Sequence, residues 1–136
     1  MRSLGLDIGE KRIGVALSDP GGILASPLTI VSRQDDKAEI EAILEIVSQN
    51  QIAKIIVGLP LSMNGRVGKQ AERVKNFTRE LCNHTDIPVE FRDERLSTVS
   101  ARRMIREGKN RRAGKKPRYD AAAAAVILQG YLDERH

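Results

Sequence analysis

The sequence predicts an α/β fold in which a mixed five-stranded sheet carries helices on both faces. Three short apolar segments open the chain without helical periodicity, and two further apolar segments then alternate with stretches of helical periodicity. Strands joined by hairpins and followed by right-handed crossovers give the strand order 3-2-1-4-5, with strand 2 antiparallel to the rest. The 136 residues, 40% of them hydrophobic and 30% charged, suffice for one core, so we expect a single domain over residues 1–136.

The first three strands are predicted at residues 3–8, 12–18 and 23–32. Gly9-Glu10-Lys11 separates the first two segments and is typical of a hairpin turn. Gly21 and Gly22 lead into the third segment. Within it, Pro27 indicates an edge strand or a bulge, because proline lacks the amide donor that a sheet ladder requires.

The first helix and the fourth strand follow. Asp35 or Asp36 can cap the helix through its carboxylate. The apolar residues of the helix follow helical spacing: Ile40, Ile43, Leu44 and Val47. Residues 54–58 then form a short run rich in β-branched residues, which favours a buried parallel strand.

The second half of the chain continues the alternation. A polar, glycine-containing loop over residues 62–68 precedes a second helix with four apolar positions: Ala71, Val74, Phe77 and Leu81. Residues 88–93 are predicted as the fifth strand. Two more helices are expected, over residues 97–106 and 120–132, the first of them ended by Gly108.

Three acids stand where the chain changes structural element: Asp7, Glu94 and Asp120. Carboxylates gathered from distant segments bind hard divalent cations such as Mg²⁺ or Mn²⁺ through oxygen. Two such ions can activate water and stabilise the leaving oxygen in phosphodiester hydrolysis, so we interpret the three acids as catalytic residues and metal ligands. Asp93 is the rival of Glu94, and because neighbours in a strand point to opposite faces, only one of them should enter the site. We choose Glu94.

Positive charge is concentrated in one segment of the chain. Residues 102–118 carry nine basic side chains and one acid, a net charge of +8, whereas the whole chain nets only +5. A local positive field suits a phosphate polymer, although a solvated surface is the ordinary role of such a run. The candidate nucleic-acid contacts are therefore Lys109, Arg111, Arg112, Lys115, Lys116 and Arg118, joined by Lys11 and Arg12 of the first hairpin and by Asn64 of the loop after the fourth strand.

Other features of the composition bear on compartment and partners. Cys82 is the only cysteine, so no intrachain disulfide can form, and a reducing cytoplasm is expected. No apolar run approaches the roughly 20 residues that span a bilayer, and no secretory signal pattern opens the chain. With 3% aromatic residues there is little surface on which bases could stack, so recognition of backbone and shape is expected.

Four motifs in order resemble those of the YqgF nuclease family, also called the RuvX family, within the ribonuclease H-like fold. They are residues 6–16 (LDIGEKRIGVA), 58–65 (GLPLSMNG), 93–98 (DERLST) and 119–129 (YDAAAAAVILQ). The resemblance implies a small bacterial cytoplasmic nuclease that acts either on the 5′ end of precursor 16S ribosomal RNA or on branched DNA junctions. It also carries Asp7, Glu94 and Asp120 over as the acidic site.

Several functions remain open at this stage. Processing of precursor 16S rRNA by a metal-dependent nuclease is the first reading, with resolution of Holliday junctions as its alternative and a non-catalytic nucleic-acid-binding domain as a weaker one. Asp7-Ile8-Gly9 followed by Gly14 also resembles the first phosphate motif of actin-like ATPases and sugar kinases, but those enzymes need a second lobe that 136 residues cannot supply. The protein is expected to be a monomer or a homodimer, since a junction resolvase should be a dimer and an RNA-trimming nuclease need not be.

Overall fold

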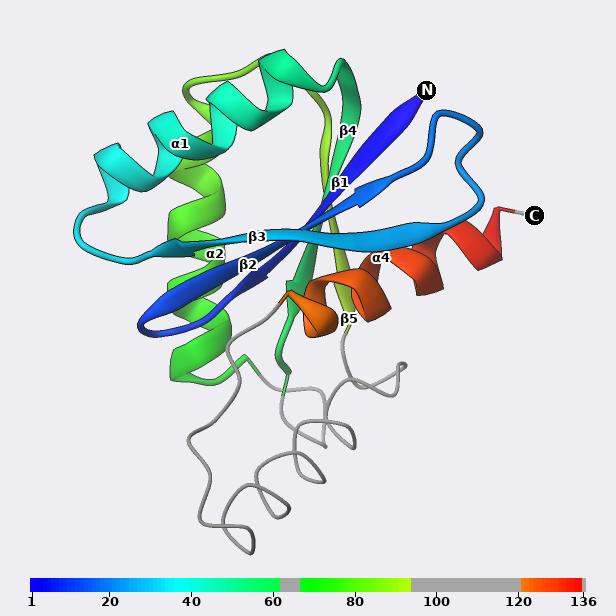
Figure 1. Ribbon diagram of the computed structural model, residues 1–136. Helices are drawn as coiled ribbons and strands as arrows, with labels where there is room; N and C mark the ends of the chain where they lie inside the picture. Colours follow the sequence, from blue (N-terminus) through cyan, green and yellow to red (C-terminus); the bar gives the residue numbers. More distant parts are fainter. Residues whose placement is uncertain (62–66, 94–120, 136) are drawn as a thin grey trace, which may run out of the picture.

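The computed structural model describes residues 1–61, 67–93 and 121–135. Within them lie five strands and three helices (Figure 1). Their bounds are β1 Arg2–Ile8, β2 Arg12–Ser18, β3 Ala25–Ser32, α1 Asp36–Gln49, β4 Ile52–Leu59, α2 Lys69–Cys82, β5 Val89–Asp93 and α4 Ala122–Glu134. The helix expected over residues 97–106 and the basic segment that follows it lie outside the described residues.

The five strands form one mixed sheet in the order β3-β2-β1-β4-β5. Strand β2 is antiparallel to both β1 and β3, whereas β4 is parallel to both β1 and β5. The predicted order and the antiparallel second strand are therefore confirmed. Because β1, β4 and β5 are parallel, their carboxyl ends meet at one edge of the sheet, the lower one in Figure 1.

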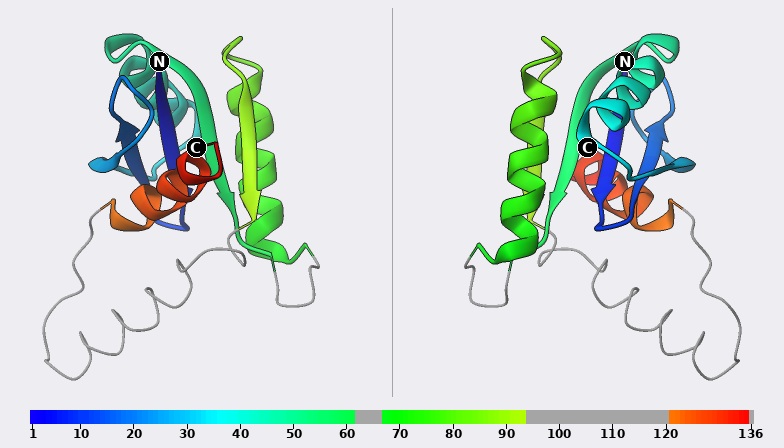
Figure 2. Two further views of the ribbon diagram at one scale, coloured as in Figure 1. Left: turned by 90° about the vertical axis from the view of Figure 1, so that its right-hand side faces the viewer. Right: turned by 90° about the vertical axis from the view of Figure 1, so that its left-hand side faces the viewer.

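Two hydrophobic clusters cover the two faces of the sheet. Leu4, Leu6 and Ile8 of β1 belong to a cluster that contains the buried faces of α1 and α2. Ile56 of β4 belongs to the other cluster, which is otherwise built mainly from α4. Helices α1 and α2 thus pack on one face and α4 packs on the other, which confirms the predicted three-layer arrangement (Figure 2).

Helix α4 lies very close to the central strand. A Cβ atom added at Gly5 of β1 would lie 2.8 Å from Leu128 Cβ and 3.0 Å from the Ala124 carbonyl oxygen. Gly14 of β2 lies less tightly against the helix, because its added Cβ would lie 3.5 Å from Ala121 Cα, an ordinary contact distance. Small residues on the sheet and on the helix therefore bring the two backbones together, and this gives Ala121 and Ala124 a packing role.

Most of the local features predicted for the first 60 residues are confirmed. Asp35 is the N-cap of α1 and accepts a hydrogen bond from Ala38 N at 2.8 Å. Pro27 lies at a register shift of the edge strand β3, as its missing amide requires. The third strand begins two residues later than predicted, at Ala25, because Ile23 and Leu24 donate their backbone N–H groups to the Asp19 carboxylate. Both hydrogen bonds lower the pKa of the Asp19 carboxyl below its ordinary value, and the one from Leu24 has the larger effect.

None of the helices in the described residues is long and apolar enough to cross a membrane.

Candidate functional site

Asp7 lies near the carboxyl end of β1, the middle strand of the sheet. Ligands of open α/β sheets bind at this edge, outside the carboxyl ends of parallel strands. The sequence placed Asp7 here because an apolar alternating run ends at Ile8 and the Gly9-Glu10-Lys11 turn follows at once. The side chain is half-buried, so it can reach both the protein and the solvent.

The face on which Asp7 lies follows from the alternation of β1. Leu6 and Ile8 belong to the cluster under α1 and α2, whereas Gly5 lies against α4. Asp7 therefore faces the α4 side of the sheet. Its partner in the register with β2 is Gly14, and Gly14 packs against Ala121. The structure thus brings Asp7 beside the residue that directly follows Asp120, whose own side chain lies outside the described residues.

The pairing of β5 with β4 places Asp93 on the opposite face of the sheet from Asp7. Leu59 of β4 pairs with Asp93, and Leu59 belongs to the cluster under α1 and α2. Gly58 pairs with Arg92, whose guanidinium lies against Gly130 of α4 and whose Nη1 is 2.6 Å from Glu134 Oε1. Arg92 is therefore on the Asp7 side and Asp93 is on the opposite side.

The turn between β1 and β2 carries two of the predicted nucleic-acid contacts. Lys11 is exposed and Arg12 is half-buried, and both follow Asp7 within five residues. Gly9 N donates to Arg12 O at 2.8 Å and closes the turn. Neighbouring Glu10 forms an ion pair with Arg73 of α2, so the turn is tied to the helix on the other face.

The remaining predicted site residues cannot be placed, because they lie outside the described ranges: Asn64, Glu94, Lys109, Arg111, Arg112, Lys115, Lys116, Arg118 and Asp120. Residues 1–61, 67–93 and 121–135 contain no group of three His, Cys, Asp or Glu side chains that could hold a metal ion.

Sequence reasoning missed a polar cluster directly behind the Asp7 turn. Arg33 follows β3 and forms an ion pair with Glu39, which is only 2% exposed. A hollow of about 470 Å³ opens beside the pair, between α1 and α2. One signal in the sequence points to this cluster: Glu39 stands one position before Ile40 and four before Ile43, on the apolar stripe of the helix, where a buried acid requires a cation.

Solved structures that align with almost the whole chain identify its fold class. RuvC of Thermus thermophilus, solved in complex with a Holliday junction substrate, aligns with a TM-score of 0.61 at 17% identity over 99% of this chain and 96% of that one. Fowlpox virus resolvase, solved with Holliday junction DNA, aligns with a TM-score of 0.54 at 13% identity over 99% of both chains. The chain therefore has the ribonuclease H-like fold that these resolvases share.

Sequence comparison narrows the class to one family. Residues 1–134 match the family described as "RuvX: Holliday junction resolvase". A protein of Dehalococcoides mccartyi is 52% identical over 93% of this chain and 94% of its own length, and one of Roseiflexus sp. is 46% identical over 98% and 95%. Both relatives are named "Putative pre-16S rRNA nuclease". The chain belongs to the RuvX family, which confirms the resemblance seen in its motifs.

Proposed function

We propose that this protein is a divalent-metal-dependent nuclease that hydrolyses phosphodiester bonds at the 5′ end of precursor 16S rRNA. The observation that carries the proposal is the place of Asp7, on the α4 face at the carboxyl end of the central strand, in a chain of the RuvX family. The names of relatives at 44–52% identity support the choice of substrate. Such processing would take place in the cytoplasm of a bacterium.

Asp7, Glu94 and Asp120 form the proposed acidic site. Helix α4 begins just beyond Asp120, and the contact of Gly14 with Ala121 supports its approach to Asp7. Asp93 lies on the opposite face by register, so strand alternation favours its neighbour Glu94 as the third acid.

Mg²⁺ or Mn²⁺ fits this set of donors, because both ions prefer carboxylate oxygens. When bound, the metal supplies activation of the attacking water and charge neutralisation at the leaving oxygen. The chain itself supplies the three carboxylates and the frame that fixes them. Gly5 lets α4 approach the sheet closely, and the turn after Asp7 brings Lys11 and Arg12 to the same end of the molecule.

The phosphate backbone is the proposed contact of the basic residues. Lys11 and Arg12 lie near Asp7, and the segment over residues 102–118 adds a net charge of +8. Phosphate contacts position a nucleic acid without reading its sequence, so these residues would hold the strand in register with the acids.

Resolution of Holliday junctions is the second candidate function. The description of the family and the titles of both aligned structures favour it. A resolvase makes paired symmetric cuts and should act as a homodimer. Processing of one RNA end is compatible with a monomer.

The test is cleavage by the purified protein of two labelled substrates, a precursor 16S rRNA 5′ fragment and a four-way DNA junction. We expect cleavage of the RNA with Mg²⁺ or Mn²⁺, none with excess chelator, and none by the Asp7→Asn variant, which keeps the size of the side chain but loses its charge. Asp133→Asn on α4, far along the helix from Ala121, is the matched control and should cleave normally. Paired cuts in the junction by a dimer, with intact RNA, would establish the second candidate instead.

A further inference from the structure

We infer that Arg33, assisted by Gln70, positions Asp7 by holding the backbone carbonyl groups of the two residues that follow it, Ile8 and Gly9. This inference rests on the proposed function, because it assumes that Asp7 acts in the acidic site. Arg33 and Gln70 touch neither substrate nor metal in this account. They act through the backbone of β1.

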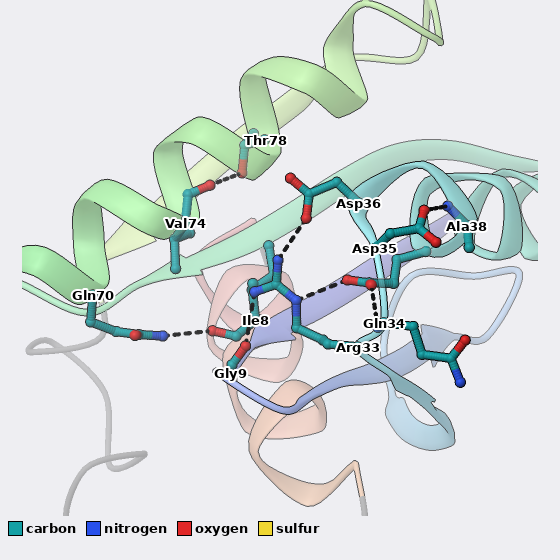
Figure 3. A network of polar contacts seen from close by, with 11 residues as sticks. Ile8, Gly9, Arg33, Gln34, Asp35, Asp36, Ala38, Gln70, Val74 and Thr78 are labelled. Carbon is teal, nitrogen blue, oxygen red and sulfur yellow. Dashed lines mark hydrogen bonds and ion pairs between the residues drawn. The ribbon is translucent and has the colours of Figure 1, made fainter.

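The side chains of Arg33 and Gln70 come from different parts of the fold and bind the carbonyl groups of two consecutive residues (Figure 3). Arg33 Nη1 donates to Gly9 O at 3.0 Å, and Gln70 Nε2 of α2 donates to Ile8 O at 3.1 Å. The backbone of Arg33 also donates to Lys11 O at 2.9 Å. The turn after Asp7 is therefore held by both the side chain and the backbone of Arg33.

The sheet alone gives this part of β1 less support. The register of β1 with β4 ends at Leu6 and Val57, one residue before Asp7. On the other side, β2 continues to pair with β1 as far as Ile8. Gln70 thus binds the Ile8 carbonyl beyond the last residue pair of the β1–β4 ladder.

Arg33 is itself held in a fixed orientation. Its Nε donates to Glu39 Oε1 at 2.8 Å, its Nη2 donates to Asp36 Oδ1 at 3.0 Å, and its guanidinium lies over the Phe77 ring at 5.1 Å. The second oxygen of Glu39 accepts from Gln34 N at 2.7 Å. A planar guanidinium with all three nitrogens engaged can define the place of a carbonyl group far better than a flexible side chain.

The burial of Glu39 argues for a geometric role. Glu39 is 2% exposed, and removing a carboxylate and a guanidinium from water costs nearly as much as their attraction returns. An apolar pair would stabilise the core equally well, but it could not donate to Gly9 O. Groups that hydrogen-bond metal ligands directly orient them in many sites, and their loss typically lowers metal affinity about 10- to 100-fold. Because Arg33 and Gln70 act one step further away, through the backbone, we expect an effect at the lower end of this range.

Direct binding of Mn²⁺, measured by titration calorimetry, tests the inference without relying on cleavage. Arg33→Lys keeps the charge but cannot bind Glu39, Asp36 and Gly9 together, so we expect about tenfold weaker binding of Mn²⁺. Hydrogen exchange of the peptide that contains residues 8–12 should accelerate. Gln70→Leu, which buries no unpaired charge, should shift both measurements in the same direction.

Two matched variants control for lost ion pairs and lost stability. Glu90→Gln weakens an ion pair that does not involve Arg33, between Lys54 and Glu90 at 2.7 Å, and Thr78→Val removes a buried hydrogen bond of α2 to Val74 O at 2.7 Å. Neither touches the β1–β2 turn, so both should bind Mn²⁺ as the wild type does, even where the melting temperature falls.

The outcomes separate this inference from the proposed function. If Asp7→Asn binds Mn²⁺ like the wild type, the proposed site itself is wrong. If Asp7→Asn loses binding but folded Arg33→Lys and Gln70→Leu keep it, with unchanged exchange in residues 8–12, only the positioning role is overturned. Should Arg33→Lys fail to fold, Gln70→Leu decides the question alone.

Discussion

At the scale of single residues, strand register shows on which face of the sheet Asp93 lies. Asp93 pairs with Leu59 and lies on the α1/α2 face, away from Asp7. An acid on that side of the sheet cannot share a metal ion with Asp7 on the other, because the sheet itself lies between them.

This separation gives a prediction for the two adjacent acids. Glu94→Gln should lower kcat by at least about 100-fold, since loss of a direct ligand should cost no less than loss of an outer partner. Asp93→Asn is the matched control and should stay close to wild type. Metal-dependent cleavage rates of both variants, with circular dichroism to verify folding, check the expectation. A reversed order of the two rates would show that Asp93, not Glu94, serves the site.

At the scale of elements, the contact between α4 and the centre of the sheet sets how closely the start of α4 approaches the end of β1 that carries Asp7. Gly5 has no space for a side chain, whereas Gly14 does: an added Cβ at Gly14 meets its neighbours at 3.5 Å or more. Both glycines face the same helix, so they form a matched pair.

Gly5→Ala should therefore destabilise the fold by about 1–3 kcal/mol, the usual cost of overpacking a tight core. Gly14→Ala should change the free energy of unfolding by no more than about 0.5 kcal/mol, because its new methyl group finds ordinary contact distances. Urea denaturation followed by circular dichroism measures both values. Equal stability of the two variants would mean that α4 can move away from β1 without cost.

At the scale of the whole molecule, charge is distributed unevenly. Residues 102–118 net +8 in a chain that nets +5, so the rest of the protein is slightly acidic. A nucleic acid should therefore be drawn to one region of the molecule, and association should weaken as salt screens that field.

Replacing Lys115, Lys116 and Arg118 with alanine should weaken binding with little dependence on base sequence. If all three contact phosphates of single-stranded RNA, the slope of log affinity against log salt should become about 2 units less steep. A triple variant at Lys37, Lys75 and Arg79, on α1 and α2, makes the same change in net charge and should retain the wild-type slope. Fluorescence anisotropy at several salt concentrations measures all three proteins. Identical slopes throughout would make the basic segment an ordinary solvated surface.

Much of the architecture was determined by the sequence itself. Short apolar segments located the five strands, and helical spacing of apolar residues located α1 and α2, because each pattern reflects which side of one short element meets the core. Helix α4 was also predicted, over residues 120–132. Hairpin turns and right-handed crossovers then allowed only a few strand orders, and the predicted one is observed. The family followed from four motifs, each of them local.

Only the tertiary structure decided which distant side chains meet. The contacts of Arg33 with Gly9 and of Gln70 with Ile8 span 24 and 62 residues, and no local pattern encodes such a meeting. The face of Asp93 likewise depends on its register with β4, which is set by packing against a neighbouring strand. Periodicity belongs to a single element and can be read along the chain, whereas register and polar clusters arise only when elements pack together.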